Sequence, residues 1–213
     1  MATWTARVIT NGWDDEAKGE PAKKRDTFTL LYTGVFTPRR RPDKLVGAVN
    51  WLIDTGKLGP HQIRVQFVGP RLDRYVPAQR WFECPGYVSH DGLQKYRHEA
   101  DVLVLLLDPT PENAGRYSGK AFEYIAANRP ILGIGPRCGV AEALLDETAT
   151  GHMVGNTVPE IATTILRLYR QWQDGVTVTP NWHAIDRYHR RYLTRKLALE
   201  LDAICRKWPS SPT

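Results

Sequence analysis

Three consecutive arginines stand in a segment with the chemistry to bind phosphate groups. Arg39, Arg40 and Arg41 lie in the sequence TGVFTPRRRP (residues 33–42), which also contains Gly34. A guanidinium group can hold two phosphate oxygens at once, and a glycine lets the backbone come close to a ligand. The same composition is typical of a surface loop that its arginines keep soluble. This segment alone therefore leaves both interpretations open.

A second candidate lies where a helix is predicted to begin, at Ser118 and Gly119. Lys120 falls in the first turn of this helix, and Glu123 follows three residues later on the same face. The free N–H groups of a helix N-terminus attract anions. Phosphates can therefore lie against the helix start while the Glu123 carboxylate accepts two hydrogen bonds from a ribose diol. The alternative is an ordinary surface ion pair, worth only a few tenths of a kcal/mol.

A third candidate is the short loop GYVSHDG (residues 86–92), which is rich in groups that form hydrogen bonds. The part of it from Tyr87 and Val88 to Ser89 and His90 can pass under a nucleobase and bind it through backbone atoms. In the alternative interpretation the loop is a plain turn between a strand and a helix, with Ser89 as the helix cap.

The sequence predicts neither a bound metal ion nor another cofactor. Its six histidines and three cysteines have no ligand spacing, and His90 and His98 are eight residues apart. The cysteines, Cys84, Cys138 and Cys205, are odd in number and far apart, which also argues against a disulfide framework.

Short apolar runs alternate with amphipathic stretches along most of the chain, and this pattern predicts the elements that would position these loops. Strands are expected over residues 28–32, 63–68, part of 81–88, 102–107 and 131–134, and helices over 43–55, 91–99, 118–128, 140–145 and 159–172. Strands that are apolar throughout their length are typical of a parallel sheet covered on both faces. The predicted fold class is therefore α/β, a Rossmann-like parallel sheet with helices on both faces, and ligands of such sheets bind at the carboxyl ends of the strands.

The composition agrees with a folded domain that has anionic partners. The 213 residues are 42% apolar and 24% charged, and the formal net charge is +6. The longest aliphatic run, residues 102–107, is far shorter than the roughly 20 residues of a spanning helix, and residues 1–12 lack the apolar core of a signal peptide. We therefore expect a cytoplasmic protein that can touch an acidic membrane face. Nucleic acid is not an expected partner, because no strand platform of interleaved aromatic and basic residues is recognisable.

Three parts are predicted along the chain: an N-terminal segment and basic loop over 1–25, a sheet domain over 26–175 and a basic helix with a tail over 176–213. The helix is expected to run from 182 to 207 without interruption. In one interpretation it packs its apolar side chains on the sheet domain, namely Ile185, Tyr188, Tyr192, Leu197, Leu201 and Ile204. In the other it is a brace or interfacial helix that meets another domain or acidic lipid.

Five sequence pieces occur in an order that resembles a known family. They are VITNGWD (8–14), LLYTGVF (30–36), VQFVG (65–69), GYVSHDGLQKYRHEADVLVLLL (86–107) and SGKAFEYIAANRPILGIG (118–135). Over about residues 7–172 the chain resembles the C-terminal, nucleotide-sugar-binding domain of a GT-B glycosyltransferase of family 4. The stretch around 182–204 is similar to the terminal helix with which these enzymes cross back to their first domain. The most specific piece is KAFEY (120–124), followed by Arg129 and Pro130.

The resemblance implies a role for each of the three candidate loops. It makes Glu123 the ribose-binding carboxylate and assigns the diphosphate to Lys120, the backbone of Ser118 and Gly119, Gly34, and an arginine of the 39–41 run. It also implies that Gly69 borders the donor site and that the loop from Tyr87 to His90 holds the base. The candidates for catalysis are Lys120, Glu123 and Arg40, which would place the donor and stabilise the leaving diphosphate.

Two departures from the family pattern bear on function. A second, sugar-binding glutamate is often found eight positions before the ribose-binding one, and here that position is Gly115. The resemblance also begins at the segment that joins the two domains of such enzymes, so the first, acceptor-binding domain is expected to be missing from this chain. The expectation is therefore the donor-binding half of a hexosyltransferase, retaining by resemblance, which binds a UDP-, GDP- or ADP-sugar for polysaccharide synthesis and is inactive alone. The alternative is a non-catalytic binding or scaffold module whose donor site has decayed.

Overall fold

The computed structural model describes residues 6–15, 18–19 and 25–207, and its centre is one six-stranded parallel sheet. The strands are β1 (Phe28–Thr33), β2 (Ile63–Val68), β3 (Phe82–Gly86), β4 (Val102–Leu106), β5 (Ile131–Ile134) and β6 (Gly151–Val154), in the spatial order β3-β2-β1-β4-β5-β6. This is the order of a Rossmann-like sheet. The predicted fold class is confirmed.

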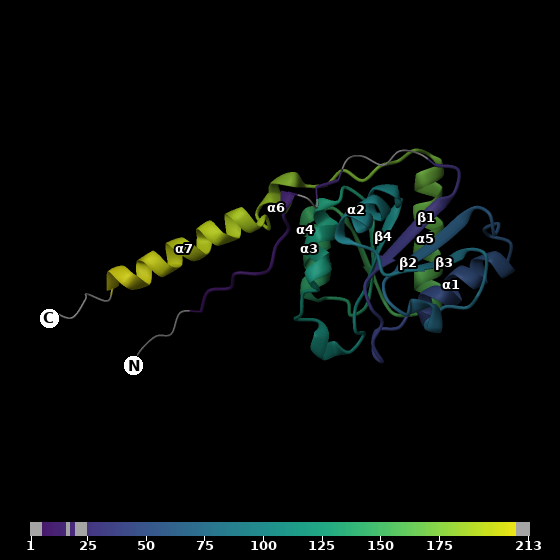
Figure 1. Cartoon of the computed structure of the whole chain (residues 1–213), viewed down its shortest axis with the longest axis horizontal. Helices are drawn as coiled ribbons and strands as arrows, with labels where there is room; N and C mark the ends of the chain where they lie inside the picture. Colours follow the sequence, from purple (N-terminus) through teal and green to yellow (C-terminus); the bar gives the residue numbers. More distant parts are fainter. Residues whose placement is uncertain (1–5, 16–17, 20–24, 208–213) are drawn as a thin grey trace.

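Helices cover both faces of the sheet (Figure 1). The α-helices are α1 (Asp43–Asp54), α2 (His90–Glu99), α3 (Gly119–Ala126), α4 (Val140–Thr148), α5 (Val158–Gln173), α6 (Trp182–Asp186) and α7 (Arg190–Lys207), with short 3₁₀ turns at Leu72–Tyr75 and Pro111–Asn113. Helices α1 and α5 share one apolar cluster with alternate residues of β1 and β4, and α2, α3 and α4 share another with the remaining residues. The strands are apolar throughout because both of their faces are buried.

The order of the strands fixes where a ligand can bind. From β1 the chain steps outward to β2 and β3, and it then returns to the other side of β1 to form β4, β5 and β6. Connections therefore leave the carboxyl ends of β1 and β4 in opposite directions, and in sheets of this kind ligands bind at that switch point. The loops that follow β1, β2 and β3, together with the start of α3, meet at this edge.

The predicted set of strands lacks one member, and one predicted helix needs correction. Strand β6 (Gly151–Val154) was not predicted, because its four residues contain a glycine and a histidine and form the edge of the sheet. The helix expected over 182–207 is interrupted at residues 187–189. There the backbone N–H groups of Arg187, Tyr188 and His189 bond three residues back, and the next N–H, that of Arg190, donates to Trp13 O in the N-terminal segment.

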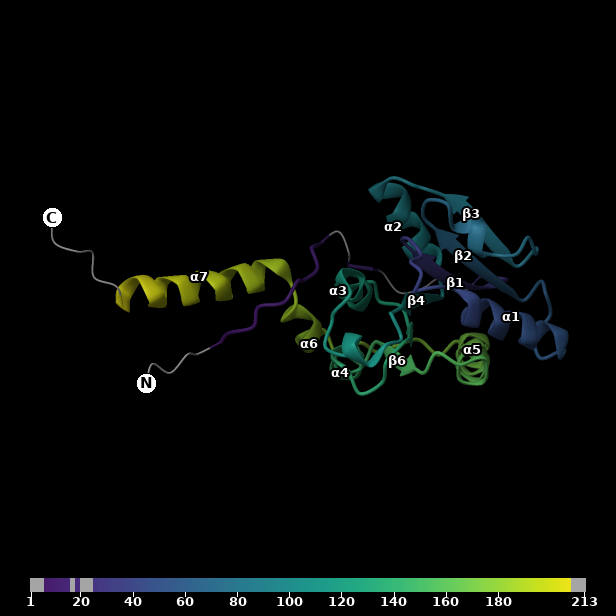
Figure 2. The same ribbon diagram turned by 90° about the horizontal axis from the view of Figure 1, so that it is seen from below.

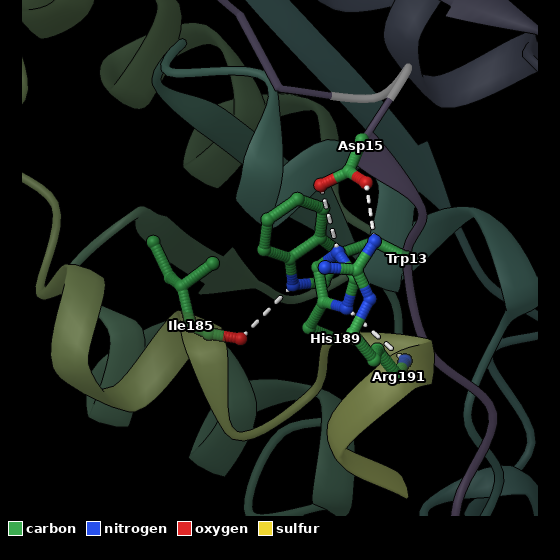
Figure 3. A network of polar contacts seen from close by, with 5 residues as sticks. All are labelled: Trp13, Asp15, Ile185, His189 and Arg191. Carbon is green, nitrogen blue, oxygen red and sulfur yellow. Dashed lines mark hydrogen bonds and ion pairs between the residues drawn. The ribbon is translucent and has the colours of Figure 1, made fainter. Parts of the chain in front are cut away.

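The N-terminal segment and the break between α6 and α7 form a joint. Trp13 donates its backbone N–H to Tyr188 O (3.0 Å), and its carbonyl accepts from the N–H of Arg190 (2.9 Å). Its indole Nε1 donates to Ile185 O (3.0 Å), and its ring meets that of His189 edge-on (Figure 3). His189 and Arg191 both contact the Asp15 carboxylate, and Arg190 contacts Asp14. This joint sets the direction in which α7 leaves the domain.

Helix α7 does not pack on the sheet domain. It extends away from it, with the N-terminal segment beside it (Figures 1 and 2), and an ion pair joins Arg7 to Glu200. Of the six apolar residues expected to pack inward, Ile185 is buried and Tyr188 partly buried. The other four, Tyr192, Leu197, Leu201 and Ile204, are 46–59% exposed, so the packing interpretation is wrong for α7. The predicted loop over 18–25 falls largely on residues 20–24, which lie outside the described residues.

Candidate functional site

Two glycines bring the carboxyl ends of β1 and β2 together. Gly34 donates its N–H to Val68 O (2.8 Å), and Gly69 donates to Gly86 O (2.9 Å). A Cβ atom on Gly69 would lie 1.8 Å from Gly34 O, and one on Gly34 would lie 1.7 Å from the Nζ of Lys120. Gly34 also has a φ of +122°, which disfavours any other residue. Both glycines are therefore required for the geometry of this edge.

Lys120 reaches from the first turn of α3 across to the end of β1. Its ammonium donates to Thr33 O and lies 5.0 Å from the centre of the Tyr32 ring. Burial and, to a smaller extent, the charges of Arg40 and Arg97 lower the pKa of Lys120 to about 8, and Glu123 opposes the shift. Burial likewise raises the pKa of Tyr32 to about 12, so this hydroxyl stays neutral. The site thus holds a half-buried, positively charged group at neutral pH.

The three arginines of the loop have different surroundings. Arg41 forms a two-pronged ion pair with Asp43, at 2.8 and 3.2 Å, so its charge is already balanced. Arg39 is exposed. Arg40 folds back onto the loop, where its Nη2 donates to Val35 O (3.3 Å) and its charge acts on Lys120. Of the three, Arg40 is the one whose charge faces the Lys120 side of the site.

Helix α3 is held against β1 beside this cluster. The hydroxyl of Tyr124 and that of Thr33 lie 2.9 Å apart in the interior, and burial raises the pKa of Tyr124. At the helix start, Ser118 has extended backbone, and no described residue caps the helix with a side chain. The first N–H groups of α3, at Gly119 and Lys120, thus lie at the switch point of the sheet.

Glu123 is paired with an arginine that the sequence analysis did not single out. Arg97, on α2, donates from Nη2 to the Glu123 carboxylate. The side chain of Arg97 is 4% exposed and that of Glu123 is 35% exposed, so the carboxylate lies between the arginine and solvent. The pair was missed because its members come from different helices, 26 residues apart, and no spacing rule connects them.

The loop predicted to hold a base has one clear structural role. The Oγ of Ser89 accepts the N–H of Gly92 (3.2 Å) and caps α2, as the alternative interpretation predicted. Tyr87 is 79% exposed, whereas Val88 is half-buried against the α2–α4 layer. His90 begins α2 and lines a cavity of about 30 Å³ together with Arg97 and Glu123. Base binding by this loop stays a prediction.

The cavities show how a ligand could approach Glu123. The 30 Å³ cavity is also lined by residues 12–14 and Arg190, and it has room for about one water molecule. A ribose would have to reach Glu123 from its exposed side. A much larger cavity, of about 540 Å³, lies at the opposite edge of the sheet, where Phe28, Val102, Ile131 and Gly151 begin their strands beneath residues 175–178.

The structure places no carboxylate at the position of the second family glutamate. Gly115 stands there, and a Cβ on it would meet only open space. The nearby Asp108 accepts the N–H of Thr110 (3.1 Å), and Glu112 is exposed. In the described part of the chain no group of three or more histidine, cysteine or acidic residues is placed to hold a metal ion, and no helix there is long and apolar enough to cross a bilayer.

The fold is one that solved glycosyltransferase structures share. The chain has the Rossmann-like fold found in half of a GT-B glycosyltransferase. Among solved structures it is similar to sucrose-phosphate synthase from Thermosynechococcus elongatus, with a TM-score of 0.68 and 16% identity over 95% of this chain and 53% of that one.

Two further solved structures are similar to this chain to about the same degree. Anabaena HepE in complex with UDP-glucose has a TM-score of 0.68 and 18% identity over 92% of this chain and 57% of that one. A glycosyltransferase from Rickettsia africae has a TM-score of 0.62 and 18% identity over 92% of this chain and 56% of that one. This chain thus spans little more than half of the length of each. No protein-family model and no curated protein sequence matches it.

Proposed function

We propose that this chain is the donor-binding half of a glycosyltransferase and binds a nucleoside diphosphate sugar at the carboxyl edge of its sheet. One observation carries the proposal: Lys120 and Glu123 lie on one helix at the switch point of a GT-B half-fold, with Arg40 beside the lysine. In this arrangement Lys120, Arg40 and the start of α3 compensate the diphosphate, and Glu123 accepts the ribose hydroxyls.

The proposed mechanism follows from these roles. Transfer of a glycosyl group leaves a nucleoside diphosphate, whose extra negative charge develops as the bond to the anomeric carbon breaks. Lys120 and Arg40 stabilise that charge, and the backbone N–H groups of Gly119 and Lys120 add dipoles aimed at the same place. Glu123 fixes the ribose and so the position of the diphosphate. A second domain supplies the acceptor hydroxyl, so the half described here binds donor without transferring it.

The deciding experiment is a calorimetric titration with UDP, GDP and ADP, repeated with Glu123→Ala. We expect one of the three to bind with a dissociation constant below millimolar, and Glu123→Ala to weaken it about tenfold or more through the loss of charge-assisted hydrogen bonds. Glu112→Ala, an exposed carboxylate of the same region, is the matched control. Equal affinity of wild type and Glu123→Ala would contradict the site, and no binding at all would contradict the function.

The pH dependence of that binding tests Lys120 separately. Since the pKa of Lys120 is lowered to about 8, its charge is complete at pH 7 and is lost as the pH rises through about 8. We expect nucleoside diphosphate affinity to fall about tenfold between pH 7 and pH 10. In Lys120→Met the affinity is expected to be low and flat over this range. A flat profile for the wild type would show that Lys120 does not compensate the diphosphate.

A binding module with a decayed donor site is the second candidate function. It is favoured by Gly115, which leaves the sugar without a carboxylate partner, and by the exposed apolar side chains of α7. It predicts that a chain shortened after residue 175 loses association with a partner or an acidic vesicle, while no nucleotide binds to either form. The titration above therefore separates the two candidates.

A further inference from the structure

We propose that Arg97 is a positioning residue, which holds the Glu123 carboxylate so that its second oxygen is presented to the ribose hydroxyls of the donor nucleotide. The inference rests on the function proposed above and adds a residue from α2 to a site otherwise built from α3 and the loops after β1 and β2. It concerns the ribose contact alone.

The geometry of the pair leaves one carboxylate oxygen for a ligand. Arg97 Nη2 donates to Oε2 of Glu123 from the interior side. Among the described residues Oε1 accepts no hydrogen bond, and the side chain as a whole is 35% exposed. An arginine that binds one carboxylate oxygen from the interior side restricts the rotation of the carboxylate, because guanidinium and carboxylate groups prefer fixed relative orientations. The other oxygen is then the one left for a ribose that approaches from solvent.

The burial of Arg97 is hard to explain by stability. It is the one buried side chain of α2, whereas the apolar Leu93 and Tyr96 of the same helix, which pack on the cluster of α3 and α4, are only partly buried. Its Nε is buried and has no hydrogen-bond partner in the described part of the chain. Burying a guanidinium group with an unsatisfied donor costs free energy that one ion pair does not recover, and an apolar residue of similar volume is often at least as stable. The arrangement is instead suited to orienting Glu123.

The charge of Arg97 also acts on the rest of the site. It faces Lys120, Glu123 and Tyr124 on α3, and His90 on its own helix lines the same small cavity. Glu123 therefore lies between two cations, Arg97 beneath it and Lys120 one turn earlier on α3.

The test compares two ligands that differ only in the ribose hydroxyls. Whichever of UDP, GDP or ADP binds is titrated against wild type, Arg97→Met and Arg97→Lys, and so is its 2′,3′-dideoxy counterpart. We expect Arg97→Met to weaken the ribonucleotide about tenfold and the dideoxy nucleotide less than twofold. Arg97→Lys should recover part of the loss. In the background of Glu123→Ala, removing Arg97 should cost almost nothing further, because the two residues act as one unit.

Lys95→Met is the matched control, because Lys95 is an exposed cation of the same helix. Equal losses for the ribonucleotide and the dideoxy nucleotide in Arg97→Met, or no loss for either, would overturn the inference. If Glu123→Ala shows the diol-specific loss and Arg97→Met does not, the proposed function stands and the role of Arg97 fails. If no nucleoside diphosphate binds, both fail. Should Arg97→Met not fold, the smaller diol-specific loss expected for Arg97→Lys decides the question.

Discussion

Replacing Trp13 by alanine is expected to lower the free energy of unfolding by about 3–5 kcal/mol. The Trp13 side chain is 2% exposed and packs with α3 and α6, and its Nε1–H bonds to Ile185 O. The substitution leaves a cavity the size of an indole and removes one of the two hydrogen bonds that Ile185 O accepts, the other coming from the N–H of Tyr188. Urea unfolding followed by far-ultraviolet circular dichroism measures the loss.

Trp51→Ala is the matched control, because Trp51 on α1 is 44% exposed. We expect it to change the free energy of unfolding by less than about 1 kcal/mol. Trp13→Ala should also expose the bonds between residues 185 and 195 to proteolysis, since the joint that directs α7 is lost. Equal stability of the two variants would contradict the account of the joint.

Replacing Arg129 by methionine is also expected to cost about 3–5 kcal/mol of unfolding free energy. The buried guanidinium donates to three backbone carbonyls, Ala100 O (2.8 Å), Asn128 O (2.9 Å) and His98 O (2.9 Å). It also lies near the buried carboxylate of Asp101, whose pKa is raised by burial. Methionine fills a similar volume but leaves the carbonyls unpaired and the carboxylate without a nearby buried cation.

Arg170→Met is the control for that measurement, because Arg170 is an exposed residue of α5. We expect its unfolding free energy to stay within about 0.5 kcal/mol of the wild type. Nucleoside diphosphate binding by folded Arg129→Met should be unchanged, since Arg129 lies at the amino edge of the sheet, opposite the candidate site. A large loss of affinity without loss of stability would show that Arg129 acts on the site.

Much of the sheet could be predicted from local sequence, because the signal that marks a buried parallel strand is itself local. Residues 63–68 and 131–134 are strands with the predicted bounds. The break between α6 and α7 could not be predicted, because its cause is Trp13, some 175 residues away in the chain. The amphipathic pattern runs through residues 187–189 without interruption, and only the tertiary contact interrupts the helix.

The candidate site was predictable to a similar degree. Lys120 and Gly34 were each singled out by residue type, and the structure brings them into contact. The three arginines were equivalent in sequence and became distinct only when Asp43 balanced Arg41 and folding turned Arg40 inward. Arg97 stood within a stretch of charged residues typical of a solvated helix face. Its burial depends on how α2 packs against α3, which no local pattern specifies.

The joint at Trp13 has a consequence for the order in which the parts of the protein fold. Its partners, Ile185, Tyr188 and Arg190, are translated more than 170 residues after it. The sheet can assemble while the chain is still being made, because its strands pair with neighbours that are synthesised before residue 155. During that time the α3 neighbours of the indole are already present, but its hydrogen-bond partner Ile185 O is not. Closing so long a loop comes last, so the direction of α7 is set only after synthesis of the domain is complete.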